Sequence, residues 1–106
     1  MGQRFEHFRG ATFRLPATYL DDLGAPKSLV GVTITPRLEM GTGPSVLTAP
    51  ILDVNVGAFV ITGNIALTTL WDLGVWPLYL AYDQTILGQP QREVELVCLV
   101  HVKDAL

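Results

Sequence analysis

Apolar and polar residues alternate along several stretches of this chain, and one clear stretch runs from Val30 to Met40. Its even-numbered positions are apolar, and the polar residues between them are Thr33, Thr35, Arg37 and Glu39. A period of two is typical of a β-strand that turns one face to the core. Because Pro36 cannot donate a backbone hydrogen bond, this strand is predicted to lie at a sheet edge or to contain a bulge.

The alternation returns near the end of the sequence, from Arg92 to Val102. One face of this predicted strand carries Val94, Leu96, Cys98, Val100 and Val102. The opposite face carries Glu93, Glu95 and His101, and also Val97 and Leu99. Two aliphatic side chains on an outer face indicate that a neighbouring molecule covers it.

Four further strands are predicted over residues 11–20, 45–54, 58–67 and 75–83. The residues at 55–57 form a short link of the hairpin type, and turn-forming residues separate other strands at 21–26, 41–44 and 87–90. A helical turn is expected only within residues 66–73. Six or seven short strands with frequent turns predict an all-β fold, an immunoglobulin-like antiparallel β-sandwich.

The turn before the strand over 75–83 has a distinctive spacing. Immunoglobulin-type sandwiches enter a central strand through an Asp-x-Gly-x-aromatic turn, in which the aromatic side chain bonds back to the preceding loop. Asp72, Gly74 and Trp76 have this spacing. We expect the indole N–H of Trp76 to make that bond. An ordinary turn is the alternative.

A length of 106 residues fits one domain, with residues 1–10 as an N-terminal arm and 11–106 as the sandwich. Hydrophobic residues make up 49% of the chain and charged residues only 16%. This balance excludes disorder and predicts that neighbours cover part of the surface. The net charge of -3 argues against a duplex-DNA partner.

The first ten residues lack the apolar stretch of a secretion signal, and no run is long and apolar enough to cross a membrane. The single cysteine, Cys98, cannot form an internal disulfide. We therefore expect synthesis in a reducing cytoplasm and no membrane partner.

Few residues are candidates for catalysis. Cys98 and His101 are three positions apart on one predicted strand, so they point to opposite faces and cannot act as nucleophile and base. Glu93 and Glu95 share a face, and we interpret them as edge charges that discourage random strand pairing. No catalytic residue is predicted, and the chain is not expected to be an enzyme.

Two pairs of side chains have the oxygen donors that a metal ion requires. Asp21 with Asp22, and Asp53 with Asn55, lack the glycine and the distant glutamate of a calcium loop. We expect these side chains to cap turns. The sequence predicts no metal site and no cofactor.

Basic and aromatic side chains interleave near the N-terminus, at Arg4, Phe5, Phe8, Arg9, Phe13 and Arg14. Such mixtures bind single-stranded nucleic acid in some proteins, but the negative net charge argues against a nucleic-acid partner here. Arginine and aromatic residues are also enriched at protein interfaces. We expect the arm to dock on a neighbouring subunit, with packing against its own sandwich as the alternative. The predicted interface residues are Arg4, Phe5, Phe8, Arg9, Val97 and Leu99.

Several short motifs follow one another along the chain: Gly10-Ala-Thr-Phe13, Asp22-Leu-Gly-Ala-Pro26, Leu29-Val-Gly31, Gly57-Ala-Phe59-Val, Trp71 to Gly74 and Pro77-Leu-Tyr79-Leu-Ala-Tyr82-Asp83. From the first to the last they span residues 10–83, about two-thirds of the sequence. With these motifs the chain resembles the small immunoglobulin-like domains of tailed-bacteriophage tail and baseplate proteins, such as the N-terminal domain of baseplate upper proteins. The first eight residues depart from the family pattern.

The resemblance implies a structural, non-catalytic protein of the virion. Its expected partners are tail, baseplate, fibre or capsid subunits and symmetry-related copies of itself, and it would sit in the tail or baseplate or anchor fibres. A capsid decoration, head-fibre or neck subunit is the alternative. Larger family members continue into a stalk or fibre, so any fibre is expected to be another polypeptide, because the sequence stops at Leu106.

A carbohydrate- or ligand-binding module is the alternative of another class. Its stacking platform would consist of Trp71, Trp76, Tyr79 and Tyr82. The alternation argues against this platform, because Trp76 and Tyr82 fall on the predicted core face of their strand.

Overall fold

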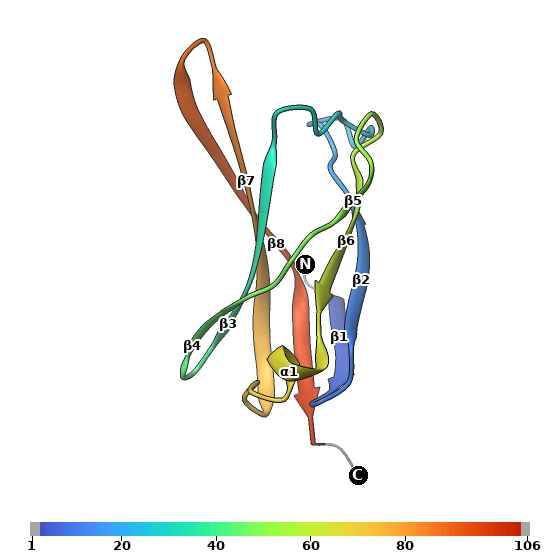
Figure 1. Ribbon diagram of the computed structural model, residues 1–106, viewed down its shortest axis with the longest axis vertical. Helices are drawn as coiled ribbons and strands as arrows, with labels where there is room; N and C mark the ends of the chain where they lie inside the picture. Colours follow the sequence, from blue (N-terminus) through green and yellow to red (C-terminus); the bar gives the residue numbers. More distant parts are fainter. Residues whose placement is uncertain (1–2, 105–106) are drawn as a thin grey trace.

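The computed structural model describes residues 3–104, which form eight β-strands and one short helix (Figure 1). In chain order these are β1 (Gln3–Phe8), β2 (Phe13–Thr18), β3 (Thr33–Met40), β4 (Gly43–Val46), β5 (Ile51–Asp53), β6 (Ala58–Gly63), α1 (Ile65–Thr68), β7 (Gly74–Ile86) and β8 (Gln89–Lys103). A five-stranded sheet has the order β1-β8-β7-β3-β4, and a three-stranded sheet has the order β2-β6-β5. The predicted all-β sandwich is therefore confirmed.

Strand β1 lies within the segment predicted to be an arm. It runs parallel to β8 at the edge of the larger sheet, from Gln3 opposite Cys98 to Phe8 opposite Lys103. The other strand pairs are antiparallel. The prediction of a wholly antiparallel sandwich is wrong at this edge, because alternation shows which face of a strand is buried and not which strand lies beside it.

Residues 45–54, predicted to be one strand, belong to two. Strand β4 lies in the larger sheet and β5 in the smaller one, and residues 47–50 cross between the layers (Figure 1). Leu47 N–H donates to the Pro36 carbonyl at 3.0 Å, and Thr48 N–H donates to the Thr62 carbonyl at 3.0 Å. The chain thus passes from β3 to β6 within two residues. The strand that contains Pro36 was predicted to lie at a sheet edge or to contain a bulge, and this prediction is wrong, because β3 lies between β7 and β4 and pairs with both without a register shift. Strand β4 pairs with β3 only from Arg37 onward, so the missing donor of Pro36 falls where β4 leaves the sheet.

The core fills the space between the two sheets. Its largest fully buried side chains are Trp71, Phe13, Phe59, Leu29, Leu38, Ile61, Leu78 and Leu80. Trp71 donates its indole N–H to Ser45 Oγ at 2.9 Å, so the polar atom of this buried ring has a partner. His7 of β1 packs edge-on against the rings of Phe13 and Trp71, and its Nε2 lies 3.0 Å from the Ala11 carbonyl oxygen.

The turn before β7 has the predicted corner geometry. The indole N–H of Trp76 donates to the backbone oxygen of Asp72 at 2.9 Å. Gly74 has a φ of +136°, and a Cβ there would lie 2.9 Å from the indole ring of Trp76. Glycine is required at this position because the ring lies directly against the backbone.

One bulge interrupts the alternation of β8. Consecutive residues of β7 pair with Cys98 and then with Leu96, which leaves Val97 as the extra residue. The Val97 side chain packs against the core. The prediction that Val97 lies on the outer face is therefore wrong.

The bulge also reverses the faces of the preceding residues. Val94 and Leu96 are 62% and 46% exposed on the outer face, whereas Glu93 pairs with the buried Tyr82 and shares the inner face with Glu95. The prediction that Val94 and Leu96 belong to the core is wrong. A single inserted residue shifts the side-chain period by one, and alternation alone does not reveal it.

Helix α1 is a single turn that begins after Asn64. The side-chain oxygen of Asn64 accepts the N–H of Leu67 at 2.8 Å, which caps the helix. This turn overlaps the stretch predicted to be helical. Among the described residues, no helix is long and apolar enough to span a membrane.

Gly57 and Gly24 have similar φ values, +71° and +80°, but differ in the room available for an added side chain. Substitutions at these two positions therefore separate backbone strain from steric clash. A Cβ at Gly57 would lie 2.3 Å from the carbonyl oxygen of Lys27, while nothing lies within 4 Å of one at Gly24. We predict that Gly24→Ala lowers the free energy of unfolding by roughly 1–2 kcal/mol. Gly57→Ala should cost a further ~1–3 kcal/mol from the clash. Urea unfolding measures both, and equal losses would contradict the prediction.

The buried His7 predicts an acid dependence of stability. Burial lowers the pKa of His7 below its ordinary value of 6.5, although the hydrogen bond to Ala11 opposes the shift. The unfolded chain binds this proton more tightly, so stability is lost as the pH falls below 6.5. His7→Phe should remove this loss, as measured by thermal unfolding against pH. In this variant the Ala11 carbonyl oxygen still accepts the Thr68 hydroxyl at 2.8 Å, so it is not left without a hydrogen bond. An acid dependence of stability that is unchanged by His7→Phe would contradict its assignment to His7.

Candidate protein–protein interface

Strands β7 and β8 extend beyond the strands beside them. Strand β3 pairs with β7 only as far as Asp83, and β1 pairs with β8 only from Cys98. Residues 84–91 therefore form a two-stranded ribbon that projects from one end of the molecule (Figure 1). We call these residues the ribbon. Neither of its faces rests on the core, so its side chains are available to another molecule.

The tip of the ribbon is a two-residue turn formed by Leu87 and Gly88. Their φ values are +52° and +78°, as a type I′ turn requires. The Leu87 side chain is 97% exposed and that of Ile86 is 49% exposed. A leucine backbone is strained in the left-handed region, and exposure of its apolar side chain to water is unfavourable. The folding of the isolated domain therefore does not account for leucine at this position.

A stacked tyrosine pair supports the inner face at the base of the ribbon. The ring centroids of Tyr19 and Tyr82 are 4.3 Å apart. The Tyr19 hydroxyl donates to Glu93 at 2.8 Å, and the Tyr82 hydroxyl donates to Glu95 at 2.5 Å. Burial, followed by the contact with Glu95, raises the pKa of Tyr82. Lys27 Nζ lies 5.0 Å from the centre of the Tyr19 ring.

The outer face at the base of the ribbon has a shallow hollow of about 250 Å³, lined by Thr35, Arg37, Glu39, Tyr79, Ala81, Arg92 and Val94. Both of its guanidinium groups are paired. Arg92 makes two bonds to Asp83, at 2.6 and 3.1 Å, and Arg37 lies 3.2 Å from Glu39. The hollow therefore has a defined shape, but neither of its two arginines is free to bind an anionic ligand.

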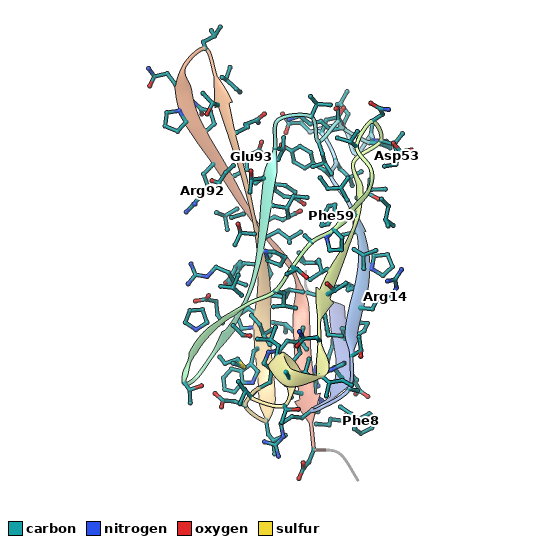
Figure 2. All side chains as sticks on the ribbon, in the orientation of Figure 1. Phe8, Arg14, Asp53, Phe59, Arg92 and Glu93 are labelled. Atoms are coloured by element: carbon teal, nitrogen blue, oxygen red, sulfur yellow. The ribbon has the colours of Figure 1, made fainter. Side chains whose placement is uncertain are left out.

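The predicted interface residues of the N-terminal segment do not all point outward. Phe5 packs against the core, and Arg9 is paired with Asp104 at 3.0 Å. Arg4 is exposed, and Phe8 is 51% exposed at the end of the molecule opposite the ribbon (Figure 2). Arg4 and Phe8 are thus the members of this group that are most open to a partner.

The two predicted interface residues of β8 also separate. Leu99 is half-buried on the outer face, opposite Arg4 of β1, while Val97 faces the core. The exposed aliphatic residues of this face are Val94 and Leu96, which sequence reasoning assigned to the core. The apolar character of both faces of this strand is the sequence signal that could have found them.

The candidate catalytic residues lie as the alternation predicts. Cys98 is buried on the inner face, and burial raises the pKa of its thiol. His101 is half-buried on the outer face, 3.9 Å from Glu6. The two side chains therefore do not form a nucleophile and base pair.

Of the four residues weighed as metal ligands, Asp21 and Asp53 cap turns. Asp21 Oδ1 accepts the N–H groups of Leu23 and Ala25 at 2.9 and 3.0 Å, and Asp53 Oδ1 accepts that of Asn55 at 3.1 Å. Within residues 3–104, no three His, Cys, Asp or Glu side chains gather as a metal site.

The four aromatic side chains considered for ligand stacking do not form a common platform. Trp71 and Tyr82 are buried, at 1% and 3% exposure. Trp76 lies against Gly74, and Tyr79 faces the outer hollow. The carbohydrate-binding alternative therefore lacks the exposed surface it requires.

No protein-family model matches the chain, and no curated protein matches it in sequence. A solved structure does match in fold: the N-terminal domain of phage TP901-1 ORF48, a baseplate upper protein. The TM-score is 0.63 at 15% sequence identity, and the match covers 97% of this chain and 85% of that chain. The resemblance to a phage baseplate domain is thereby confirmed for the fold.

The hydroxyl of Tyr82 predicts an alkaline dependence of stability. Its pKa is raised, so the folded chain keeps the proton where the unfolded chain loses it, and stability falls as the pH rises above 10.0. We predict that Tyr82→Phe lowers the free energy of unfolding by about 1 kcal/mol at neutral pH and removes part of the alkaline loss. Urea unfolding at stepped pH measures both effects. Tyr79→Phe on the outer face is the control, and an identical alkaline change in both variants would contradict the prediction.

Proposed function

We propose that this chain is a structural, non-catalytic protein of a tailed-bacteriophage virion, which assembles into the tail or baseplate through protein–protein contacts. The observation that carries the proposal is the likeness in fold to the N-terminal domain of phage TP901-1 ORF48. The match extends over 97% of this chain, so it is not confined to a few strands that many sandwiches share. At 15% identity it supports a common architecture, and the role in the virion is inferred from it.

The surface of the domain supports an assembled state. Seventeen large hydrophobic side chains are exposed within the described residues, although charged residues make up only 16% of the chain. Some lie on the ribbon, and others follow α1 at the opposite end of the molecule. Exposed hydrophobic side chains that lie together on a folded chain usually mark contact sites. The proposed partners are other virion proteins and symmetry-related copies of this chain.

We assign separate roles to the predicted interface residues. Arg4, Phe8 and Leu99 would contact a neighbour directly, and Arg9 would contribute at the same end as Phe8. Phe5 and Val97 would hold the strands that carry them, because both pack inward. The tip residue Leu87 joins this set, because its side chain is the most exposed of the large hydrophobic ones within residues 3–104.

The location in the virion is tested on particles made from the genome that encodes the chain. After heads and tails are separated, we expect mass spectrometry to find the chain in the tail fraction. Its absence from all particles would contradict a virion role. Its recovery with heads alone would favour the capsid or neck alternative.

Leu87→Asn tests the contribution of the ribbon tip to assembly. Asparagine tolerates the left-handed conformation, so the free energy of unfolding should change by less than about 0.5 kcal/mol. We predict that incorporation into particles falls at least about tenfold in competition with the unchanged chain, which corresponds to ~1.4 kcal/mol. Quantitative mass spectrometry of particles measures the ratio. Leu70→Asn, at a position that is 76% exposed near α1 at the other end of the molecule, measures the effect of removing exposed apolar surface in general. Equal effects of the two changes would contradict a specific role of the tip.

A further inference from the structure

Strand β8 has an open edge along much of its length. Its residues 89–97 pair with β7 on one side, and within residues 3–104 no strand lies on the other side, because β1 begins opposite Cys98. A strand placed there would continue the line of β1 upward along β8. The open segment is about 30 Å long at the usual rise per residue. We call residues 89–97 the β8 edge.

The β8 edge is longer than the outer edge of β1, which has six residues, and it is better suited to accept a strand than the edge strands β2, β4 and β5. Strand β5 has three residues, and the edge strands β2 and β4 contain Pro16 and Pro44. Proline, short length and bulges are among the features that discourage a further strand from adding to an edge. The one bulge of β8, at Val97, lies at the end of the β8 edge next to β1. The β8 edge carries proline only at Pro90, next to the turn, so residues 91–97 keep their backbone donors and acceptors.

The two faces beside this edge differ in chemistry. The outer face presents Val94 and Leu96, both exposed. The inner face presents Glu93 and Glu95, which border a hollow of about 90 Å³ together with Thr18, Tyr19, Leu20 and Tyr82. A strand added here would therefore place alternate side chains against aliphatic groups and against carboxylates.

The charge around the β8 edge is strongly negative. Residues 20–31, 53–57 and 83–95, at the same end of the molecule, contain six of the ten acidic residues and two of the seven basic ones. Of the two bases, Arg92 is paired with Asp83, and Lys27 lies 4.0 Å from Glu93. Figure 2 shows Asp53 and Glu93 at this end and Arg14 farther along the molecule. A cationic partner fits this surface.

A second copy of the same edge does not fit. In an antiparallel pair of two β8 edges, any register centred near Val94 brings Glu93 or Glu95 close to the same residues of the other copy. Like charges on facing strands are destabilising. The charges that were interpreted from sequence as a barrier to random pairing thus also select against self-pairing.

We propose that the β8 edge binds an extended segment of another protein by β-strand addition, and that this segment alternates Lys or Arg with aliphatic residues. Its backbone pairs with residues 91–97, its basic side chains reach Glu93 and Glu95, and its aliphatic side chains cover Val94 and Leu96. The inference rests on the proposed function, because it names the chemistry of the segment that a neighbouring virion protein supplies.

Peptide binding to the full chain tests this proposal. The probe is a synthetic peptide of alternating lysine and valine, as long as the β8 edge. We expect it to slow amide hydrogen exchange within residues 91–97 at least about fivefold at saturation. Two control peptides should have no effect: one with glutamate in place of lysine, and one with alternate backbone nitrogens methylated so that the pairing edge cannot donate.

Variants of the chain distinguish recognition by Glu93 and Glu95 from a general attraction of the peptide to a negatively charged protein. The double variant Glu93→Gln with Glu95→Gln keeps acceptors for the tyrosine hydroxyls, and we expect it to bind the lysine peptide about fivefold more weakly. The control variant Glu6→Gln with Glu39→Gln makes the same change in net charge elsewhere on the sheet and should bind as the unchanged chain does. Tyrosine fluorescence and thermal unfolding verify that both variants fold.

Four results would overturn the proposal: no slowing of exchange with the lysine peptide, equal slowing with the glutamate peptide, slowing confined to another edge, or equal weakening in the two double variants. Failure of the peptide test with normal recovery of the chain in tails rejects the β8 edge as a binding site and leaves the proposed function standing. Absence of the chain from particles rejects the proposed function, whatever the peptide result.

Discussion

The antiparallel ladder between β7 and β8 is the interaction on which the rest of this structure depends. The two strands contain 13 and 15 residues, and each of the other strands has eight residues or fewer. Strands β3 and β1 flank only part of the ladder. Its covered half supplies core residues such as Leu78 and Val100, and its uncovered half becomes the ribbon and the β8 edge. One hairpin therefore provides both the stability of the domain and its candidate contact surface.

The junction between these two halves is where the structure departs from regular geometry. The bulge at Val97 lies next to the point where β1 begins, and bulges increase the local twist of a strand. Above it, the ribbon turns away from the sandwich (Figure 1). The stacked rings of Tyr19 and Tyr82 join the ribbon base to the chain after β2. These contacts hold the exposed half in a defined position relative to the core.

The local features of the fold could be predicted from the sequence, because they depend on residues close together in the chain. The alternation identified the main strand segments, and the spacing of Asp72, Gly74 and Trp76 predicted a corner that the indole hydrogen bond confirms. The separation of Cys98 from His101 followed from the same period. The candidate interface was harder to predict from the sequence, because its exposed side chains lie beyond the bulge and at the turn of the ribbon.

The sequence by itself determined that the chain is an all-β sandwich with an unusually apolar surface and few charged groups. Only the tertiary structure decided that β1 pairs in parallel with β8, that residues 47–50 cross between the sheets, and that Val94 faces outward. The physical reason is that hydrophobic periodicity records burial of a side chain relative to its neighbours in the chain. The neighbour across the sheet, and the register at which it pairs, are set by residues far apart in sequence.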